Sequence, residues 1–280
     1  MQILRTAEEL RAWSRAARGT GKTVGLVPTM GALHAGHASL MRAARSSCDH
    51  VAASIFVNPT QFGPNEDYAR YPRSFEKDCA LAEREGVDVI FAPAVEEIYP
   101  EGAVTFVEVE GLSNRLDGHS RPGHFRGVAT VVAKLLIAAE PDRAFFGQKD
   151  AAQVAVLRRM VRDLRMGTEL VVCPIVRESD GLALSSRNVY LSPEERTQAL
   201  ALSRAINTVE DLAGHGQRKS ATLIEAAEAV LGAEPLVRVD YITAVDWETL
   251  EPVETASPGA LFAIAAWVGA TRLIDNTILP

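Results

Sequence analysis

The chain has 280 residues, more than a single domain usually holds, so its length predicts about two domains with a sizeable core. Its composition, 47% hydrophobic and 23% charged, excludes a wholly disordered or fibrous protein. The formal net charge of -7 disfavours a nucleic-acid binder, because contacts with phosphate groups favour a basic surface.

The first part of the chain alternates short apolar segments with helical ones, a pattern typical of a parallel α/β sheet. Predicted strands cover residues 23–28, 51–57, 87–91, 143–146 and 170–176. Predicted helices cover residues 7–18, 36–46, 74–85, 124–139 and 150–166. This order predicts a Rossmann-like N-terminal domain over residues 1–176.

The sequence changes in character after Val176. Residues 192–195 (Ser-Pro-Glu-Glu) are typical of the N-cap, first-position proline and acidic first turn of a long helix. Further strands are expected at residues 238–244 and 260–268, so residues 177–280 are predicted to form a smaller α+β domain.

The three cysteines, Cys48, Cys79 and Cys173, lie far apart and form no C-x-x-C motif. This spacing favours reduced thiols in a cytoplasmic protein over a disulfide framework. The first residues lack the apolar core of a signal peptide, and the sequence has no apolar run as long as a membrane span. The sequence therefore predicts a cytoplasmic protein that does not enter the membrane.

Residues 19–23 end like a phosphate-binding P-loop, but the position of the first glycine in that pattern holds Ala16. The segment also follows a predicted helix and leads into a strand, whereas a P-loop follows a strand and opens a helix. We therefore interpret it as a turn that ends a helix.

The strongest candidate site follows the strand predicted at residues 23–28, where a loop of small residues leads into a helix beginning near Gly36. Small residues let the backbone approach a ligand, the helix N-terminus offers N–H groups, and His34 and His37 can face the same phosphates. Surface histidines and a metal site are the alternatives for an H-x-x-H pair. A metalloprotease would need histidines at i and i+4 with a glutamate between them, so a nucleotide site is favoured.

Other polar segments carry weaker indications. Residues 145–150 place Lys149 where a predicted strand meets a helix, at the sheet edge where ligands bind, although an exposed Lys-Asp pair would have the same sequence. Residues 180–188, with Arg187, suit a phosphate-binding loop or a linker between domains. The amides of Gln61 and Gln153 suit a small hydroxy acid, although a lone glutamine is more often a surface residue.

Together these segments resemble the pantothenate synthetase family over nearly the whole chain. The resembling blocks read PTMGALHxGH at 28–37, FVNPxQF at 56–62, YPR at 71–73, RPGHF at 121–125, FGxKD at 146–150, DGLAxSSRN at 180–188 and RLIDN at 272–276. The resemblance implies a Rossmann-type domain of the nucleotidylyltransferase type and a smaller C-terminal domain that closes over the active site. It also implies a homodimer.

The resemblance further implies site residues. His37 is the expected proton donor, and His34, Lys149 and Arg187 are the other expected catalytic residues. Gln61 is expected to contact pantoate and β-alanine, and Gln153 to contact pantoate. The expected ATP-binding residues are Met30, Gly31, Ala32, Leu33, His34, Ala35, Gly36, His37, Gly147, Gln148, Lys149, Asp150, Val176, Leu184, Ser185, Ser186 and Arg187.

The implied reaction starts when the pantoate carboxylate attacks the α-phosphorus of ATP, giving pantoyl-adenylate and pyrophosphate. The amine of β-alanine then attacks the activated carbonyl and releases AMP. Mg²⁺ is expected on the ATP phosphates, and no protein ligand is assigned to it, because Lys77 stands where some relatives have an acid.

Different classes of protein remain as alternatives to this ligase. A nucleotidylyltransferase would adenylate a phosphate ester and stop there, and a nucleotide sensor would bind ATP without consuming it. An NAD-dependent dehydrogenase is disfavoured, because no G-x-G-x-x-G motif follows a predicted strand.

Overall fold

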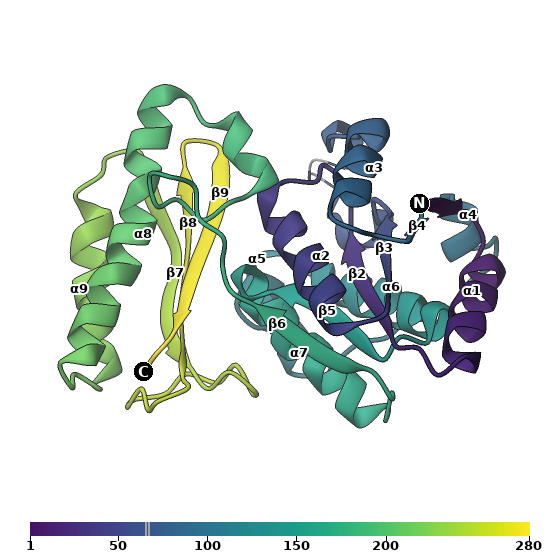
Figure 1. The fold of residues 1–280 in the computed structure, drawn as a ribbon. Helices are drawn as coiled ribbons and strands as arrows, with labels where there is room; N and C mark the ends of the chain where they lie inside the picture. Colours follow the sequence, from purple (N-terminus) through teal and green to yellow (C-terminus); the bar gives the residue numbers. More distant parts are fainter. Residues whose placement is uncertain (65, 67) are drawn as a thin grey trace. The chain divides into compact units, whose positions relative to one another are not determined.

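The computed structural model describes residues 1–64, 66 and 68–280, and the chain divides into two compact units (Figure 1). The first unit consists of Met1–Gly147 and Val156–Cys173, and the second of Gln148–Ala155 and Pro174–Pro280. The units are defined by contacts and are not continuous along the chain. The domain ranges expected from the sequence, 1–176 and 177–280, stay a prediction.

Within the described residues, the first unit is built on a six-stranded sheet in which every pairing is parallel. The strand order is β1-β4-β3-β2-β5-β6. The strands are β1 (Gln2–Leu4), β2 (Val24–Thr29), β3 (His50–Ile55), β4 (Val89–Phe91), β5 (Arg143–Gly147) and β6 (Glu169–Cys173). Central strands such as β2 are apolar and buried along most of their length, as expected for a parallel sheet covered on both faces.

Helices of the first unit pack on this sheet and on one another. They are α1 (Ala7–Gly19), α2 (Ala35–Ser47), α3 (Phe75–Arg84), α4 (Val95–Ile98), α5 (Asp117–Ser120), α6 (His124–Ala139) and α7 (Ala151–Asp163), the last of which belongs to both units. The 3₁₀ helices η1 (Pro59–Gln61), η2 (Tyr68–Arg70) and η3 (Leu112–Asn114) lie in its connections. Helix α2 packs against β2 and β5, whereas α1 packs against α6.

The segment that resembles a P-loop is a turn, as predicted. Helix α1 ends at Gly19, the N–H of Gly21 donates to the carbonyl of Arg18 at 2.9 Å, and Gly21 has a φ of +75°. Strand β2 begins at Val24, so no helix follows the turn. The segment therefore lacks the helix N-terminus that binds phosphate in a P-loop.

Strands β2 and β5 are neighbours at the point where the order of the sheet reverses. From β2 the chain proceeds to β3 and β4 on one side, and it later continues from β5 to β6 on the other side. The connections after β2 and β5 therefore diverge. In open parallel sheets, ligands bind at such a switch point, beyond the carboxyl ends of the strands.

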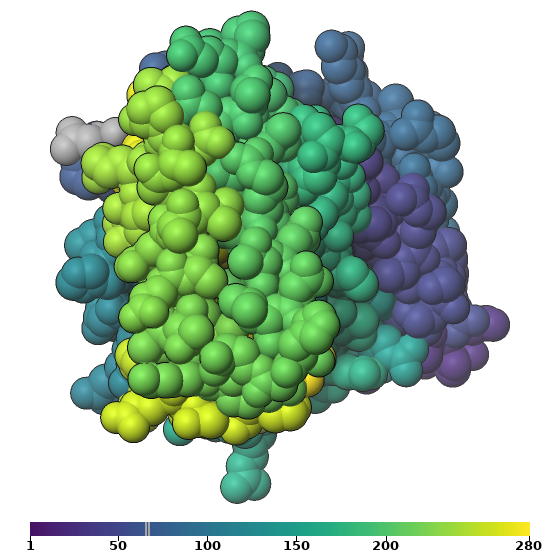
Figure 2. All heavy atoms as spheres, turned by 90° about the vertical axis from the view of Figure 1, so that its left-hand side faces the viewer, coloured from purple at the N-terminus to yellow at the C-terminus, as the bar shows by residue number. Residues whose placement is uncertain are grey.

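The second unit contains an antiparallel sheet with the order β7-β8-β9, covered by helices. Its elements are η4 (Gln148–Asp150), η5 (Ser186–Tyr190), α8 (Pro193–Gly214), α9 (Ser220–Gly232), β7 (Val237–Val245), β8 (Leu261–Val268) and β9 (Thr271–Ile278). Helices α8 and α9 pack side by side, and Figure 2 shows the outer face that they form. The predicted cap of α8 is confirmed, because Ser192 and Glu195 form a capping box ahead of Pro193.

The predicted fold class is therefore confirmed: a parallel α/β unit and a smaller α+β unit. Strands β1 and β9 have no counterpart among the predicted strands. Across the described part of the chain, no helix is both long enough and apolar enough to cross a membrane.

Candidate active site

The loop that joins β2 to α2 has a backbone conformation that few sequences allow. Gly31 has a φ of +84° and Ala32 a φ of +50°, both in the left-handed region. A Cβ on Gly31 would lie 3.0 Å from Oδ2 of Asp78 and 3.2 Å from Cγ2 of Ile55. Glycine therefore meets both a steric and a conformational requirement at this position.

The carboxylate of Asp78, on α3, holds this loop in place. It accepts hydrogen bonds from the N–H of Ala32 at 2.9 Å and of Leu33 at 2.8 Å, and from the hydroxyl of Ser74 at 3.1 Å. Asp78 is only 2% exposed, so these bonds are shielded from water. They compensate for the left-handed backbone of Ala32, a conformation that costs on the order of 1–3 kcal/mol for a residue other than glycine.

His34 and His37 cap the N-terminus of α2 reciprocally. Nδ1 of His34 accepts from the N–H of Gly36 at 3.1 Å, and Nδ1 of His37 accepts from the N–H of His34 at 3.3 Å. The two rings are neighbours, with centroids 4.1 Å apart. Because each Nδ1 accepts, the neutral tautomer of each ring carries its proton on Nε2. Each imidazole in this tautomer is a donor at Nε2, which suits a phosphate oxygen.

Gln61 belongs to a buried network of polar side chains that reaches the same loop. Its Nε2 donates to Sδ of Met30 at 2.8 Å, and its Oε1 accepts from Nδ2 of Asn58 at 3.1 Å. Asn58 is 1% exposed, and its Oδ1 accepts from the hydroxyl of Tyr99 at 2.8 Å. Burial raises the pKa of Tyr99, so the phenol keeps the proton that it donates.

The backbone of Gln61 is fixed by a second chain of contacts. Nδ1 of His124 donates to the carbonyl of Gln61 at 2.9 Å, and its Nε2 accepts from Nη1 of Arg121 at 3.1 Å. Arg121 in turn forms two hydrogen bonds with Glu66, at 2.7 and 2.6 Å. Burial and the charge of Arg121 lower the pKa of His124 from 6.5 to about 4, so the imidazole is neutral at neutral pH.

In the second unit, Lys149 and its neighbours lie on η4 against strand β9. Asn276 donates from Nδ2 to the carbonyls of Gln148 at 3.1 Å and Lys149 at 2.9 Å. Nζ of Lys149 lies 3.7 Å from Oδ1 of Asp150. The backbone that carries Lys149 is thus fixed by β9. Gln153 follows in the first turns of α7, where it is half-buried.

The predicted phosphate loop of the second unit is held by bonds within its own unit. The N–H of Leu184 donates to the carbonyl of Val176 at 2.9 Å, and Oγ of Ser185 accepts from the N–H of Arg187 at 3.2 Å. Asn188 follows directly and donates to the carbonyl of Ala183 at 3.1 Å. These contacts give the segment a defined backbone, which a simple linker would not need.

The structure thus brings part of the predicted site together within each unit. In the first unit, Gln61 contacts Met30, and the two histidines follow on the same loop and helix, while Gly147 ends the neighbouring strand β5. In the second unit, Gln148, Lys149 and Asp150 form η4, and Leu184, Ser185, Ser186 and Arg187 follow Val176 on one paired segment.

Residues that sequence reasoning left without a role complete the site. Asp78, Asn58, Tyr99, Arg121 and His124 support the loop and Gln61 in the first unit. Asp78 had a recognisable signal: Phe75, Leu81 and Ala82 lie three or four residues away on the predicted helix, so the acid falls on its apolar face. A buried acid there needs partners, and it finds them in the loop.

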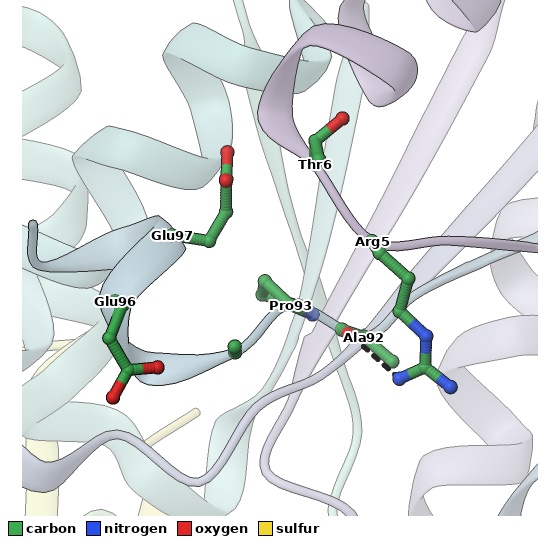
Figure 3. Close-up of a pocket in the computed structure, with 7 residues that line it drawn as sticks. Arg5, Thr6, Ala92, Pro93, Glu96 and Glu97 are labelled. Atoms are coloured by element: carbon green, nitrogen blue, oxygen red, sulfur yellow. Dashed lines mark hydrogen bonds between the residues drawn. The ribbon is translucent and has the colours of Figure 1, made fainter.

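A separate open pocket of about 540 Å³ lies in the first unit where β1 and β4 end (Figure 3). It is lined by Arg5, Thr6, Ala92, Pro93, Ala94, Glu96 and Glu97. Nη1 of Arg5 donates to the carbonyl of Ala92 at 2.8 Å, and Oε1 of Glu97 accepts from the N–H of Ala7 at 2.8 Å. None of the predicted site residues lines this pocket, so it is a poorer candidate than the β2–α2 loop.

A metal site was the alternative for the histidine pair. Among the described residues, no set of three or more His, Cys, Asp or Glu side chains is arranged to hold a metal ion. The pair itself offers imidazole nitrogens, whereas Mg²⁺ prefers oxygen ligands.

Comparison with known proteins identifies the family. The chain matches the family model of pantoate-beta-alanine ligase over residues 2–278. A pantothenate synthetase of Acidobacterium capsulatum is 66% identical over 260 residues, which cover 92% of this chain and 86% of the relative.

Solved structures give the same result. A crystal structure of pantothenate synthetase from Thermus thermophilus has a TM-score of 0.93 at 50% identity, covering 100% of this chain and 99% of that one. A crystal structure of pantoate-beta-alanine ligase from Francisella tularensis, complexed with beta-gamma ATP and beta-alanine, has a TM-score of 0.80 at 34% identity and covers 99% and 97%. The family resemblance seen in the sequence is thus confirmed, and this chain belongs to the pantoate-beta-alanine ligase family.

Proposed function

We propose that this chain condenses pantoate with β-alanine at the expense of ATP, giving pantothenate, AMP and pyrophosphate. The β2–α2 loop is the observation that carries the proposal. Its buried anchor Asp78 fixes the backbone ahead of the capping pair His34 and His37, beside the switch point of the sheet. The relative from Francisella tularensis, crystallised with beta-gamma ATP and beta-alanine, supports the substrate assignment.

The first half-reaction forms a bond between a carboxylate oxygen of pantoate and the α-phosphorus of ATP. The bond from that phosphorus to the bridging oxygen breaks, and pyrophosphate leaves with the electron pair. The attack brings two anions together, so catalysis depends on positioning and on positive groups near the phosphates. We assign this task to the N-terminus of α2, to His34 and His37, and to the cations Lys149 and Arg187.

His37 is the proposed proton donor, acting as a hydrogen-bond donor. Its Nδ1 accepts a backbone hydrogen bond, so the N–H that it offers is on Nε2, and complete transfer of that proton from a neutral ring would leave an imidazolate. Donation to a phosphate oxygen stabilises the charge that develops as pyrophosphate departs. His34 has the same tautomer, and we propose that it binds the phosphates beside His37.

In the second half-reaction, the neutral amine of β-alanine attacks the carbonyl of pantoyl-adenylate, and AMP leaves. We propose that Gln61 contacts pantoate and β-alanine, and that Gln153 contacts pantoate. An uncharged amide can orient a carboxylate and a hydroxyl without neutralising the attacking oxygen. The rigid support of Gln61 by Asn58 and His124 suits this orienting role.

Magnesium is proposed to enter the site on the ATP phosphates. The two oxygens of Asp78 already accept the N–H groups of Ala32 and Leu33, which argues against this carboxylate as a metal ligand. Bound on the phosphates, Mg²⁺ would offset part of their charge. We further propose, from the family resemblance, that the protein is a cytoplasmic homodimer.

The remaining predicted ATP contacts are retained as proposals. They are Met30 to His37 and Gly147 in the first unit, and Gln148 to Asp150, Val176 and Leu184 to Arg187 in the second. Glycine and small residues in the first set let a phosphate approach the backbone, and backbone N–H groups in the second set can donate to it.

Exchange of labelled pyrophosphate tests the proposal. With ATP and pantoate but no amine, label is expected to enter ATP, and the exchange is expected to stop when pantoate is omitted. Absence of exchange in the complete mixture contradicts the adenylate route. Addition of β-alanine then separates the alternatives, because a nucleotidylyltransferase makes no amide product and a nucleotide sensor releases no AMP.

A further inference from the structure

The block RLIDN at residues 272–276 resembles the family but has no role in the reaction described above. It forms the first part of β9, in the second unit. Asp275 is 1% exposed and Asn276 is 3% exposed, so an acid and an amide are buried side by side in a strand. Burial of such groups is costly unless they are fully hydrogen-bonded, and their partners therefore show what they do.

Both polar atoms of the Asn276 side chain form hydrogen bonds with η4. Its Nδ2 donates to the carbonyl of Gln148 at 3.1 Å and to that of Lys149 at 2.9 Å. Its Oδ1 accepts from Nε2 of Gln148 at 3.3 Å. The side chain thus replaces the regular backbone bonds that a single 3₁₀ turn lacks, and it fixes the peptide from which the Lys149 side chain extends.

Asp275, the preceding residue, binds the start of the second segment. Its Oδ2 accepts from Nη1 of Arg177 at 2.6 Å and its Oδ1 accepts from Nη2 at 3.0 Å, so the guanidinium is held by two parallel bonds. Nη1 of Arg177 also donates to the carbonyl of Gly181 at 3.2 Å, and Arg177 forms a β-bridge with Ala183. Asp275 therefore anchors the turn that leads to Ser185 and Arg187.

The strand that carries both side chains is itself rigid. Asp275 pairs with Ile264 and Asn276 with Ala263 in an antiparallel ladder along β8, which is almost wholly buried. Side chains on a strand are placed more accurately than side chains on loops. Two adjacent residues of one strand therefore fix two segments that are far apart in the sequence.

We propose that Asn276 and Asp275 are positioning residues for the adenylation half-reaction. Asn276 sets the position of Lys149, and Asp275, through Arg177, sets that of Arg187. The inference rests on the proposed function, in which Lys149 and Arg187 bind the phosphates. A displacement of a binding group by about 1 Å can cost on the order of 100-fold in rate, so such supports have a large effect on turnover.

A double-mutant cycle tests the role of Asn276. We expect Asn276→Ala to lower the pyrophosphate exchange rate at saturating ATP and pantoate by about 10- to 100-fold. In a Lys149→Ala background, the same substitution is expected to lower the residual rate less than about 2-fold, because its effect passes through Lys149. Asn276→Ser replaces the amide donor with a hydroxyl donor, so it is expected to restore part of the exchange rate. It takes the place of the alanine variant in the cycle if that variant does not fold.

Thr277→Val is the matched control. Thr277 is a buried neighbour on the same strand, and its hydroxyl donates to Glu210 at 2.5 Å rather than to η4. We expect this variant to lose stability without losing exchange activity. A merely structural role for Asn276 would instead give equal losses of activity and stability in the two variants, and would overturn the proposal.

The outcomes distinguish the proposal from the function on which it rests. Normal exchange in Lys149→Ala shows that the proposed role of Lys149 is wrong. The positioning role alone is overturned if Lys149→Ala loses exchange while Asn276→Ala keeps it. Fully additive losses in the double variant overturn it as well. For the second anchor, Asp275→Asn in an Arg187→Ala background is expected to show the same lack of additivity.

Discussion

His124 donates a hydrogen bond from its ring Nδ1 to the main-chain carbonyl of Gln61, over 2.9 Å. This bond requires a proton on Nδ1, and the Arg121 N–H at Nε2 requires the other nitrogen to be unprotonated. The imidazole is therefore locked as one neutral tautomer. Protonation would place a cation beside Arg121 in a buried site.

We predict that His124 makes the protein sensitive to acid. Burial and then Arg121 depress its pKa from 6.5 to about 4, so between these values the unfolded chain binds a proton that the folded chain excludes. The contribution of His124 to stability is expected to be complete above pH 6.5 and to be lost as the pH drops toward about 4. Urea unfolding at about pH 7 and about pH 5 measures the loss, and His124→Gln should lessen it.

The exposed His215 at the end of α8 provides the control for this pH effect. His215→Gln should leave the acid sensitivity unchanged. Equal acid sensitivity in the parent and in His124→Gln would contradict the assignment.

We predict that Asp78→Asn impairs both the use of ATP and the stability of the fold. The amide presents an N–H group to a backbone N–H, so one of the two bonds to Ala32 and Leu33 is lost and the loop is no longer fixed. We expect unfolding free energy to fall by about 1–3 kcal/mol, and kcat/KM for ATP to fall by on the order of 100-fold. Glu76→Gln, an exposed change on the same helix, should alter neither quantity.

Gly31→Ala and Gly102→Ala separate steric conflict from backbone strain. Both glycines have positive φ, +84° and +77°, but a Cβ on Gly31 would lie 3.0 Å from Oδ2 of Asp78, whereas one on Gly102 would meet nothing within 4 Å. Each variant is expected to lose on the order of 1 kcal/mol of stability from strain. The loss of pyrophosphate exchange should be confined to Gly31→Ala, and similar activity in the two variants would argue against a nucleotide at this loop.

We predict that His37→Ala and Lys149→Ala each lower turnover by orders of magnitude while the fold persists. These side chains are proposed to meet charge that develops during the reaction, so the substitution should affect kcat and not only KM. Steady-state kinetics and circular dichroism measure the two effects. Normal turnover in either variant would refute the role assigned to that residue.

Local patterns were sufficient to predict the strand and the helix that carry the central part of the candidate site. The buried run of β2, the small residues of the following loop and the helix that begins near Gly36 can all be read in a short stretch of sequence. The cap of α8 was predictable for the same reason, because Ser192, Pro193 and Glu195 are close together in the sequence.

Contacts between distant segments were not predictable in this way. Asp78 accepts hydrogen bonds from Ala32 and Leu33, which lie more than forty residues away in the sequence. The helix pattern shows that this acid lies on the apolar face, but it does not show which groups bind it. Strand β9 escaped prediction because Asp275 and Asn276 interrupt its apolar alternation, and their polar side chains are buried only because other segments supply the bonds.

The reciprocal cap formed by His34 and His37 joins the folding of α2 to its chemistry. The bonds that start the helix are the same ones that place each ring proton on Nε2. The protonation pattern needed for phosphate contact is therefore established as soon as the first helical turn closes, and needs no ligand to select it. Conversely, a proton added to either Nδ1 would turn two N–H groups toward each other, so the same proton that charges a ring would break one of the bonds that cap the helix.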